Sequence, residues 1–236
     1  MSEPAPVLLV HGLATSAART WGETGWLDLL ADEGRRVIAP DLPGHAGAPF
    51  DPAAPLDVHD AVLAHFPEGR FDAVGFSLGA RTLLWLAAQH PGRIGRLVVA
   101  GVGANLFRSD DHRPLAEAIE RAAGLRSDAV PAVDEPDPTV AALAHHFTEL
   151  AHASGTDPAV VAKLLGESDG RTLDAEVLAG VDADVLVVLG TEDFAGPADP
   201  LLDALPTARL VELPGVDHFA TPKSMRFLDA GLRFLS

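Results

Sequence analysis

Short apolar runs bounded by turn residues alternate with longer stretches of helical spacing along most of the chain. The apolar runs predict six buried strands, at 6–10, 36–39, 71–76, 96–101, 184–189 and 208–213. Helical spacing follows the strands at 21–33 or 25–33, 56–66, 77–90, 199–205 and 221–235. Strands that alternate with helices form a mostly parallel sheet with helices on both faces. The pattern therefore predicts an α/β fold built on a six-stranded sheet.

This alternation stops between residues 102 and 181, where strand signals are absent. Three helical patterns occur there instead, at 114–123, 139–153 and 158–165. Ligands of open α/β sheets bind at the carboxyl edge of the strands. We therefore expect the segment to form a small helical lid over that edge, inserted after the fourth strand. The prediction is one domain, with an α/β core at 1–101 and 182–236 and a helical lid insertion at 102–181.

The strand at 71–76 runs directly into a helix through residues 75–79, which match the nucleophile-elbow pattern G-x-S-x-G. Glycines are needed on both sides because a sharp turn from strand to helix packs the backbone closely and holds the serine in strained dihedral angles. The serine is left at the positive N-terminal end of the helix. The sequence therefore predicts Ser77 as a nucleophile.

A serine nucleophile needs a general base and a carboxylate that orients the base. His218 follows the last strand and precedes the closing helix, and Asp193 follows the strand at 184–189. The order Ser, Asp, His is the one this architecture uses. Three other acidic residues compete with Asp193 for the orienting position: Glu192, Asp199 and Asp217. Asp217 is a poor orienter, because neighbouring side chains in an extended loop point apart.

Five motifs in this order resemble those of the α/β-hydrolase superfamily, of the compact, lid-bearing serine-esterase type. They are His11-Gly12, the segment 41–45, the elbow at 75–79, Gly190 with Asp193, and Pro214-Gly215 with His218. The resemblance implies a catalytic triad of Ser77, His218 and Asp193. It also implies an oxyanion hole formed by the backbone N–H groups of Leu13 and Leu78. His11 and His45 are then expected to fasten the loops around the site.

Seven residues are candidates for the acyl or alcohol pocket, and ordinary core packing is at least as good an alternative for each: Trp21, Trp26, Phe76, Asn105, Leu106, Phe107 and Phe147. The predicted lid contains no cluster of arginines, which argues against a highly anionic thioester substrate.

The composition of the chain excludes several classes of binding partner and site. The chain has 17 Lys and Arg residues against 34 Asp and Glu residues, which gives a net charge of -17 and repels phosphate backbones and anionic membranes. We therefore expect no nucleic-acid and no membrane partner.

The chain has no cysteine, which excludes disulfides and thiolate sites. Neither a signal-peptide pattern nor an apolar stretch of membrane-spanning length is present, so we expect a cytoplasmic location.

These features together predict a serine hydrolase that cleaves a small-molecule carboxylic ester, or a related acyl compound, through an acyl-enzyme and without a cofactor or metal. The same triad could serve lactone opening, carbon–carbon bond hydrolysis, perhydrolysis or hydroxynitrile cleavage, which fold and triad do not separate. The alternative from another class is a non-catalytic ligand-binding member of the fold.

Overall fold

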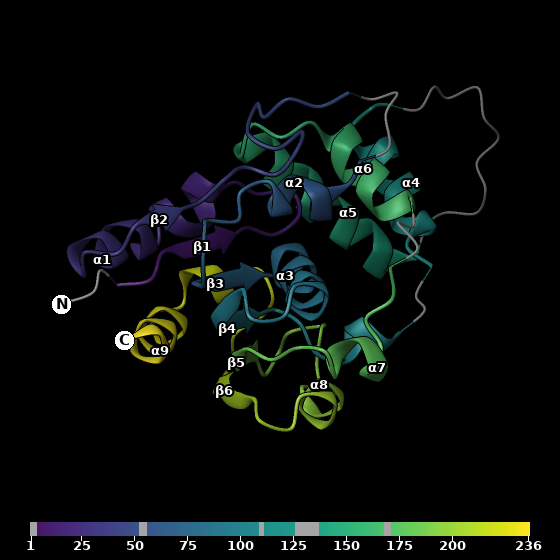
Figure 1. The fold of residues 1–236 in the computed structure, drawn as a ribbon. Helices are drawn as coiled ribbons and strands as arrows, with labels where there is room; N and C mark the ends of the chain where they lie inside the picture. The colour runs from purple at the N-terminus through teal and green to yellow at the C-terminus, as the bar shows by residue number, and fades with distance from the viewer. Residues whose placement is uncertain (1–3, 52–55, 109–110, 126–136, 168–170) are drawn as a thin grey trace.

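A computed structural model describes residues 4–51, 56–108, 111–125, 137–167 and 171–236. Within these residues six strands form one parallel sheet: β1 (Val7–Val10), β2 (Val37–Ile38), β3 (Phe71–Phe76), β4 (Ile94–Ala100), β5 (Asp184–Gly190) and β6 (Arg209–Leu213). Their order in the sheet is β2-β1-β3-β4-β5-β6 (Figure 1). The α/β fold with a six-stranded parallel sheet, predicted from the sequence, is confirmed.

The sheet is buried on both faces because successive strand residues point to opposite sides. One face contributes Leu8, Ala73, Val99 and Val187 to a core with helices α2 (Val58–Leu63), α3 (Leu78–Gln89), α7 (Ala175–Leu178) and α8 (Asp199–Ala204). The other face contributes Leu9, Val74, Val98 and Val188 to a core with the π-helical turn η1 (Ala18–Gly22) and the helices α1 (Trp26–Asp32) and α9 (Met225–Leu235). Helices thus cover the sheet on both sides, as Figure 1 shows.

Two expected helices are interrupted. The stretch predicted at 21–33 or 25–33 is divided by Gly25, whose φ of +88° lies in the left-handed region, so that η1 and α1 are separate. Trp21 and Trp26 lie on either side of this break and pack edge to face, with ring centroids 5.7 Å apart. The closing helix predicted at 221–235 begins as a short 3-10 turn, η3 (Thr221–Lys223), and continues as α9.

The chain between β4 and β5 carries the 3-10 turn η2 (Ala104–Phe107) and the helices α4 (Arg113–Ala122), α5 (Pro138–Ala153), α6 (Pro158–Gly166) and α7. The three helical patterns expected there correspond to α4, α5 and α6, whereas α7 and η2 were not predicted. The helices α4, α5 and α6 have an apolar cluster of their own, which includes Ile119, Phe147 and Val161. Ala14, from the loop after β1, belongs to the same cluster. The helical insertion therefore packs at the carboxyl edge of the sheet.

Candidate active site

The turn between β3 and α3 holds Ser77 with φ of +52° and ψ of -113°, a conformation that L-residues rarely adopt. Close packing on both sides of the turn requires glycine. A Cβ atom on Gly75 would lie 2.6 Å from the backbone nitrogen of Ala80, and one on Gly79 would lie 2.1 Å from the carbonyl oxygen of Val10. Neither position can therefore accept a side chain, as the sequence predicted. The strained Ser77 directly precedes the first residue of α3.

The structure brings Ser77, His218 and Asp193 together in one chain of hydrogen bonds. Oγ of Ser77 lies 2.9 Å from Nε2 of His218, and Nδ1 of His218 lies 2.9 Å from Oδ1 and 3.1 Å from Oδ2 of Asp193. His218 and Asp193 are both buried. Asp193 is fixed in turn, because its Oδ1 accepts a 2.8 Å hydrogen bond from the N–H of Ala195. With Nδ1–H donated to the carboxylate, Nε2 is free to accept the serine proton.

The three competing acids lie elsewhere. Glu192 is exposed, Asp199 is the first residue of α8, and Asp217 accepts a 2.8 Å hydrogen bond from the N–H of Ala220. Within the described residues Asp193 is the carboxylate that contacts the His218 ring.

Aromatic rings surround the imidazole of His218. The ring of Phe76 packs against it at a centroid distance of 5.0 Å, and the ring of Phe194 packs against it at 4.3 Å. Phe219 lies edge-on to the same imidazole at 5.5 Å. Phe194 and Phe219 were not predicted as site residues, although each directly follows a predicted triad residue. These rings hold the imidazole in place, and Phe194, 49% exposed, shields it from bulk water.

The loop after β1 lies beside the nucleophile. A Cβ atom on Gly12, the residue before Leu13, would be 3.3 Å from Cβ of Ser77, so this loop packs against the elbow. Within the described residues, the backbone N–H groups of Leu13 and Leu78 have no hydrogen-bond acceptor. An oxyanion hole requires unused N–H donors of this kind. Ala14, the following residue, has a positive φ of 62°, which shows how tightly this loop is bent.

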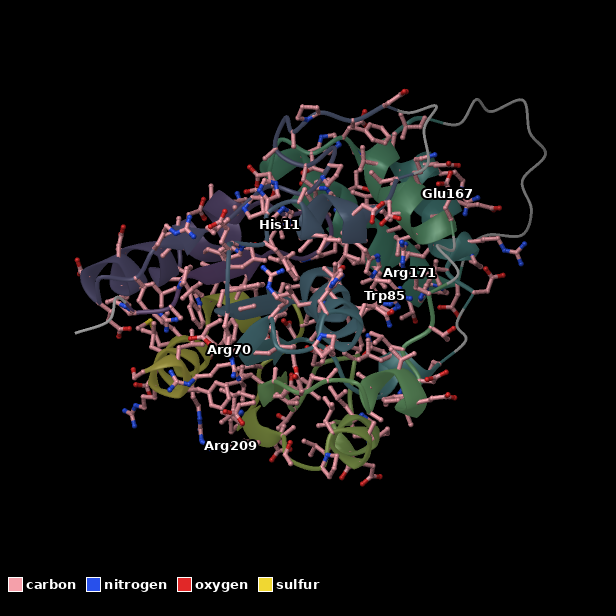
Figure 2. The ribbon with its side chains drawn as sticks, viewed as in Figure 1. His11, Arg70, Trp85, Glu167, Arg171 and Arg209 are labelled. Atoms are coloured by element: carbon pink, nitrogen blue, oxygen red, sulfur yellow. The ribbon has the colours of Figure 1, made fainter. Side chains whose placement is uncertain are left out.

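Two buried histidines fix that loop. His11, labelled in Figure 2, contacts the carbonyl oxygen of Gly12 through Nδ1 at 2.7 Å, and its Nε2 accepts a 3.0 Å hydrogen bond from the N–H of Leu42. Its Nε2 must be unprotonated to accept that bond. Burial, aided by the neighbouring His45, lowers the pKa of His11 to about 3 and keeps the ring neutral.

His45 makes a matching pair of contacts from the loop after β2. Its Nε2 accepts a 3.2 Å hydrogen bond from the N–H of Ala14, and its Nδ1 lies 3.1 Å from the carbonyl oxygen of Pro43. Burial also lowers the pKa of His45. The two rings lie 5.2 Å apart and join the loop after β1 to the loop after β2. Both histidines thus act on loop structure, as expected from the sequence.

A groove of about 820 Å³ opens beside the elbow, between α2, α3, η2, α4 and α6. Its wall includes Leu78, the residue after Ser77, although Ser77 itself does not line it. Among the residues predicted for the pocket, Asn105 and Leu106 line this groove. The others lie elsewhere: Trp21, Trp26, Phe76 and Phe147 are buried in apolar clusters, and Phe107 is exposed outside the groove.

The sequence of the chain matches a known protein family. The sequence model of the alpha/beta hydrolase fold family matches residues 5–145. The chain belongs to the α/β hydrolase fold family. The resemblance found from the sequence motifs is thereby confirmed.

Two α/β hydrolase relatives carry the same name, pimeloyl-[acyl-carrier protein] methyl ester esterase. The protein from Nitrosomonas europaea is 31% identical over 235 residues, which cover 90% of this chain and 88% of the relative. The protein from Neisseria meningitidis serogroup C is 40% identical over 79 residues, which cover 32% of this chain. In that comparison the chain spans only 30% of the length of the relative.

Solved α/β hydrolase structures agree with the architecture. The thermophilic esterase from Thermogutta terrifontis superposes with a TM-score of 0.71 at 20% identity, covering 99% of this chain and 89% of that protein. At this level of identity the similarity establishes the fold.

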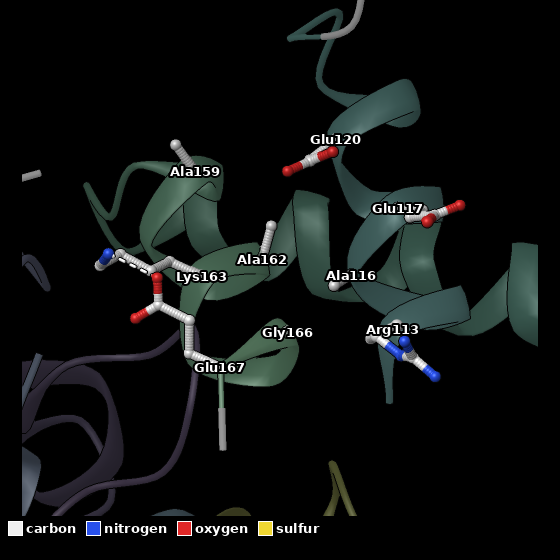
Figure 3. A pocket seen from close by; sticks show the side chains of 9 residues that line it. All are labelled: Arg113, Ala116, Glu117, Glu120, Ala159, Ala162, Lys163, Gly166 and Glu167. Carbon is white, nitrogen blue, oxygen red and sulfur yellow. Dashed lines mark hydrogen bonds and ion pairs between the residues drawn. The ribbon is translucent and has the colours of Figure 1, made fainter. Parts of the chain in front are cut away.

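This α/β hydrolase has a second hollow, of about 380 Å³, between α4 and α6 (Figure 3). Its lining combines small residues, among them Ala116, Ala162 and Gly166, with charged residues. It contains none of the residues around Ser77, so it is not part of the candidate site. Four of its lining residues also line the larger groove: Arg113, Lys163, Gly166 and Glu167.

Among the described residues, no group of three or more His, Asp or Glu side chains is arranged to hold a metal ion. None of the described helices combines the length and the apolar character needed to cross a membrane.

Proposed function

We propose that this protein is a serine hydrolase that cleaves small-molecule carboxylic esters through an acyl-enzyme intermediate. The observation that carries the proposal is the unbroken chain of hydrogen bonds from Oγ of Ser77 through the His218 ring to the Asp193 carboxylate. The names of the relatives support an ester substrate, since two of them are described as methyl ester esterases.

In the acylation step, Oγ of Ser77 attacks the ester carbonyl while Nε2 of His218 takes up its proton. Asp193 holds the imidazole in the tautomer with hydrogen on Nδ1 and stabilises the imidazolium that forms. The C–O bond of the ester then breaks, and His218 returns the proton to the departing alcohol. A water molecule, deprotonated by the same Nε2, attacks the acyl-enzyme, and the carboxylic acid leaves as Ser77 regains its proton.

In this proposal the N–H groups of Leu13 and Leu78 donate hydrogen bonds to the carbonyl oxygen and stabilise the negative charge that develops on it. Preorganised donors of this kind contribute about 3–4 kcal/mol each to transition-state stabilisation. The contacts of His11 and His45 support the role, because they hold the bent loop that carries Leu13. The helices α4, α5 and α6 are proposed to act as the lid within the segment 102–181, over a core made by 1–101 and 182–236.

An active-site-directed fluorophosphonate tests the proposal. We expect the purified protein to gain the mass of one adduct and the Ser77→Ala variant to gain none. Ser224→Ala is the matched control, since Ser224 precedes α9 without a side-chain capping bond, and it should label like the natural protein. Methyl and p-nitrophenyl esters of graded acyl length then define the substrate. Absence of labelling, or equal labelling of Ser77→Ala, would exclude the serine hydrolase.

A further inference from the structure

The groove beside the elbow gathers positive charge in a protein whose net charge is -17. Five cationic side chains line it, contributed by α3, by the end of η2, by α4, by α6 and by the segment after residue 170: Arg81, Arg108, Arg113, Lys163 and Arg171. Three carboxylates line the same walls. A local excess of positive charge in so acidic a chain favours an anionic ligand at this place.

Each carboxylate in the groove is already paired with one of the cations. The pairs are Asp57 with Arg171 at 2.7 Å, Asp111 with Arg113 at 2.7 Å, and Glu167 with Lys163 at 2.6 Å. Figure 3 shows the Lys163–Glu167 pair on α6, with Arg113 across from it on α4. The guanidinium of Arg171 also lies over the ring of Trp85, 4.9 Å from its centroid; both residues are labelled in Figure 2. In these pairs each carboxylate balances the charge of one cation.

Two cations remain without a carboxylate partner among the described residues. Nη2 of Arg81 donates a 2.8 Å hydrogen bond to the carbonyl oxygen of Arg171, and Nη2 of Arg108 donates a 3.0 Å hydrogen bond to that of Gly196. A bond to a carbonyl orients a guanidinium without neutralising it, and each guanidinium has five N–H donors. Among the described residues, Arg81 and Arg108 therefore have no carboxylate that balances their charge, and both have spare N–H donors.

The excess charge lies next to the nucleophile. The backbone N–H of Arg81 donates a 3.0 Å hydrogen bond to the carbonyl oxygen of Ser77, so the two residues are one helical turn apart and share a face of α3. Arg108 follows β4, which pairs with β3 along the register Phe76–Ala100. Arg81 thus lies on the first turns of α3, and Arg108 lies directly after η2, in the segment that follows β4.

We propose that this groove binds a terminal oxyanion of the substrate, a carboxylate or a phosphate, and that Arg81 and Arg108 select for it. The inference rests on the proposed ester hydrolysis at Ser77 and adds the class of ester. A planar guanidinium matches both oxyanions in geometry and forms short, charge-assisted hydrogen bonds with them. The substrate is then an ester whose reacting carbonyl lies at Ser77 and whose charged end lies in the groove.

The test compares methyl esters that differ only at the far end of the acyl chain. The methyl half-ester of adipic acid carries a terminal carboxylate, methyl hexanoate is its neutral counterpart, and the corresponding phosphonate carries a phosphate-like end. Methanol release gives kcat/KM for each ester. We expect the natural protein to prefer a charged ester over methyl hexanoate. A larger preference for the phosphonate would indicate a phosphate-bearing substrate, and the reverse would indicate a dicarboxylic half-ester.

The variants Arg81→Met and Arg108→Met should each reduce the ratio of kcat/KM for the charged and neutral esters by about 10- to 100-fold, which is the loss of one charge-assisted hydrogen bond. Arg108→Lys keeps the charge and should retain much of the preference. Arg233→Met, on the exposed side of α9, is the matched control and should leave the ratio unchanged. Fluorophosphonate labelling of Ser77 shows that each variant is folded. If Arg81→Met does not fold, the comparison of Arg108→Met with Arg108→Lys still tests the proposal, because Arg108 is exposed.

Equal kcat/KM for charged and neutral esters in the natural protein would overturn the inference while leaving ester hydrolysis intact. A preference that survives in both methionine variants would also overturn it. A protein that hydrolyses no ester and does not label at Ser77 would overturn the proposed function and the inference with it.

Discussion

The hydroxyl of Ser77 lies 2.9 Å from Nε2 of His218, although 141 positions separate the two residues in the chain. The parallel sheet makes this possible, because β3 and β6 both end at the same edge and the residues that follow them emerge on the same side. His218 therefore reaches the elbow from beyond β6, and Asp193 reaches it from the end of β5.

Replacing Asp193 by Asn should lower kcat for ester hydrolysis by about 10⁴-fold with little change in fold, because the amide no longer holds hydrogen on Nδ1 of His218. Steady-state kinetics with a p-nitrophenyl ester measures the loss. Glu192→Gln is the matched control next to it in sequence, since Glu192 is exposed, and it should keep nearly full activity. An active Asp193→Asn variant would show that another group orients the imidazole.

Gly79→Ala should destabilise the protein by about 3 kcal/mol or more, because the added methyl group would lie 2.1 Å from the carbonyl oxygen of Val10 and force β1 away from α3. Urea denaturation gives the change in the free energy of unfolding. Gly22→Ala supplies the comparison, since a Cβ atom there meets its nearest neighbour, Leu27, at an ordinary 3.7 Å. Equal stability of the two variants would contradict the packing argument.

The stability of the protein should fall as pH decreases below about 6.5. The pKa of His11 is about 3 in the folded protein, against 6.5 for an unperturbed histidine. Between these values the unfolded chain binds a proton that the folded chain does not, so the free energy of unfolding rises with pH and reaches its full value above 6.5. His11 alone should account for a loss of about 2 kcal/mol between pH 8 and pH 5.

Urea denaturation at several pH values checks this slope, and the variant His11→Asn isolates the histidine. The variant should be less stable at pH 8, because the N–H of Leu42 loses its acceptor, yet its stability should vary less between pH 8 and pH 5. An unchanged pH dependence in the variant would assign the acid sensitivity to other groups, His45 among them.

Arg35→Met should cost about 3–5 kcal/mol of stability, because it leaves the carboxylate of Asp72 buried without its partner. The pair is nearly inaccessible, and Arg35 also donates to the carbonyl oxygen of Leu235 at 2.9 Å. The matched comparison is Arg233→Met, which removes the exposed pair with Asp229 and should have no measurable effect on thermal unfolding. A similar effect of both substitutions would show that burial of the first pair is unimportant.

The sequence allowed the sheet and the elbow to be predicted because both depend on local patterns. The apolar runs gave six strands, and the glycines at 75 and 79 marked a turn that accepts no side chain on either flank. The orienting acid was harder to select, because Glu192, Asp199 and Asp217 are also acidic residues near the ends of predicted strands. Its position after β5 decided the prediction, and the structure places its carboxylate against the imidazole.

The groove could not be predicted, because its charges come from segments far apart in the chain. Arg81 and Arg171 are 90 positions apart, and their hydrogen bond depends on tertiary packing. The absence of an arginine cluster in the sequence of the insertion was therefore a poor guide to the charge around the site. Phe194 and Phe219 were missed for a similar reason: only the folded loops show that both rings face His218.

Strands β4 and β5 pair in the sheet but are far apart in the chain, which affects how the protein folds during synthesis. About 80 residues of the helical insertion separate them, so β4 leaves the ribosome long before the strand that will pair with its free side. At about 5–20 residues per second, roughly 4–18 s pass before β5 is complete. During that interval the apolar edge of β4 is open to pairing with another nascent chain, and rapid overproduction should send part of the protein into aggregates.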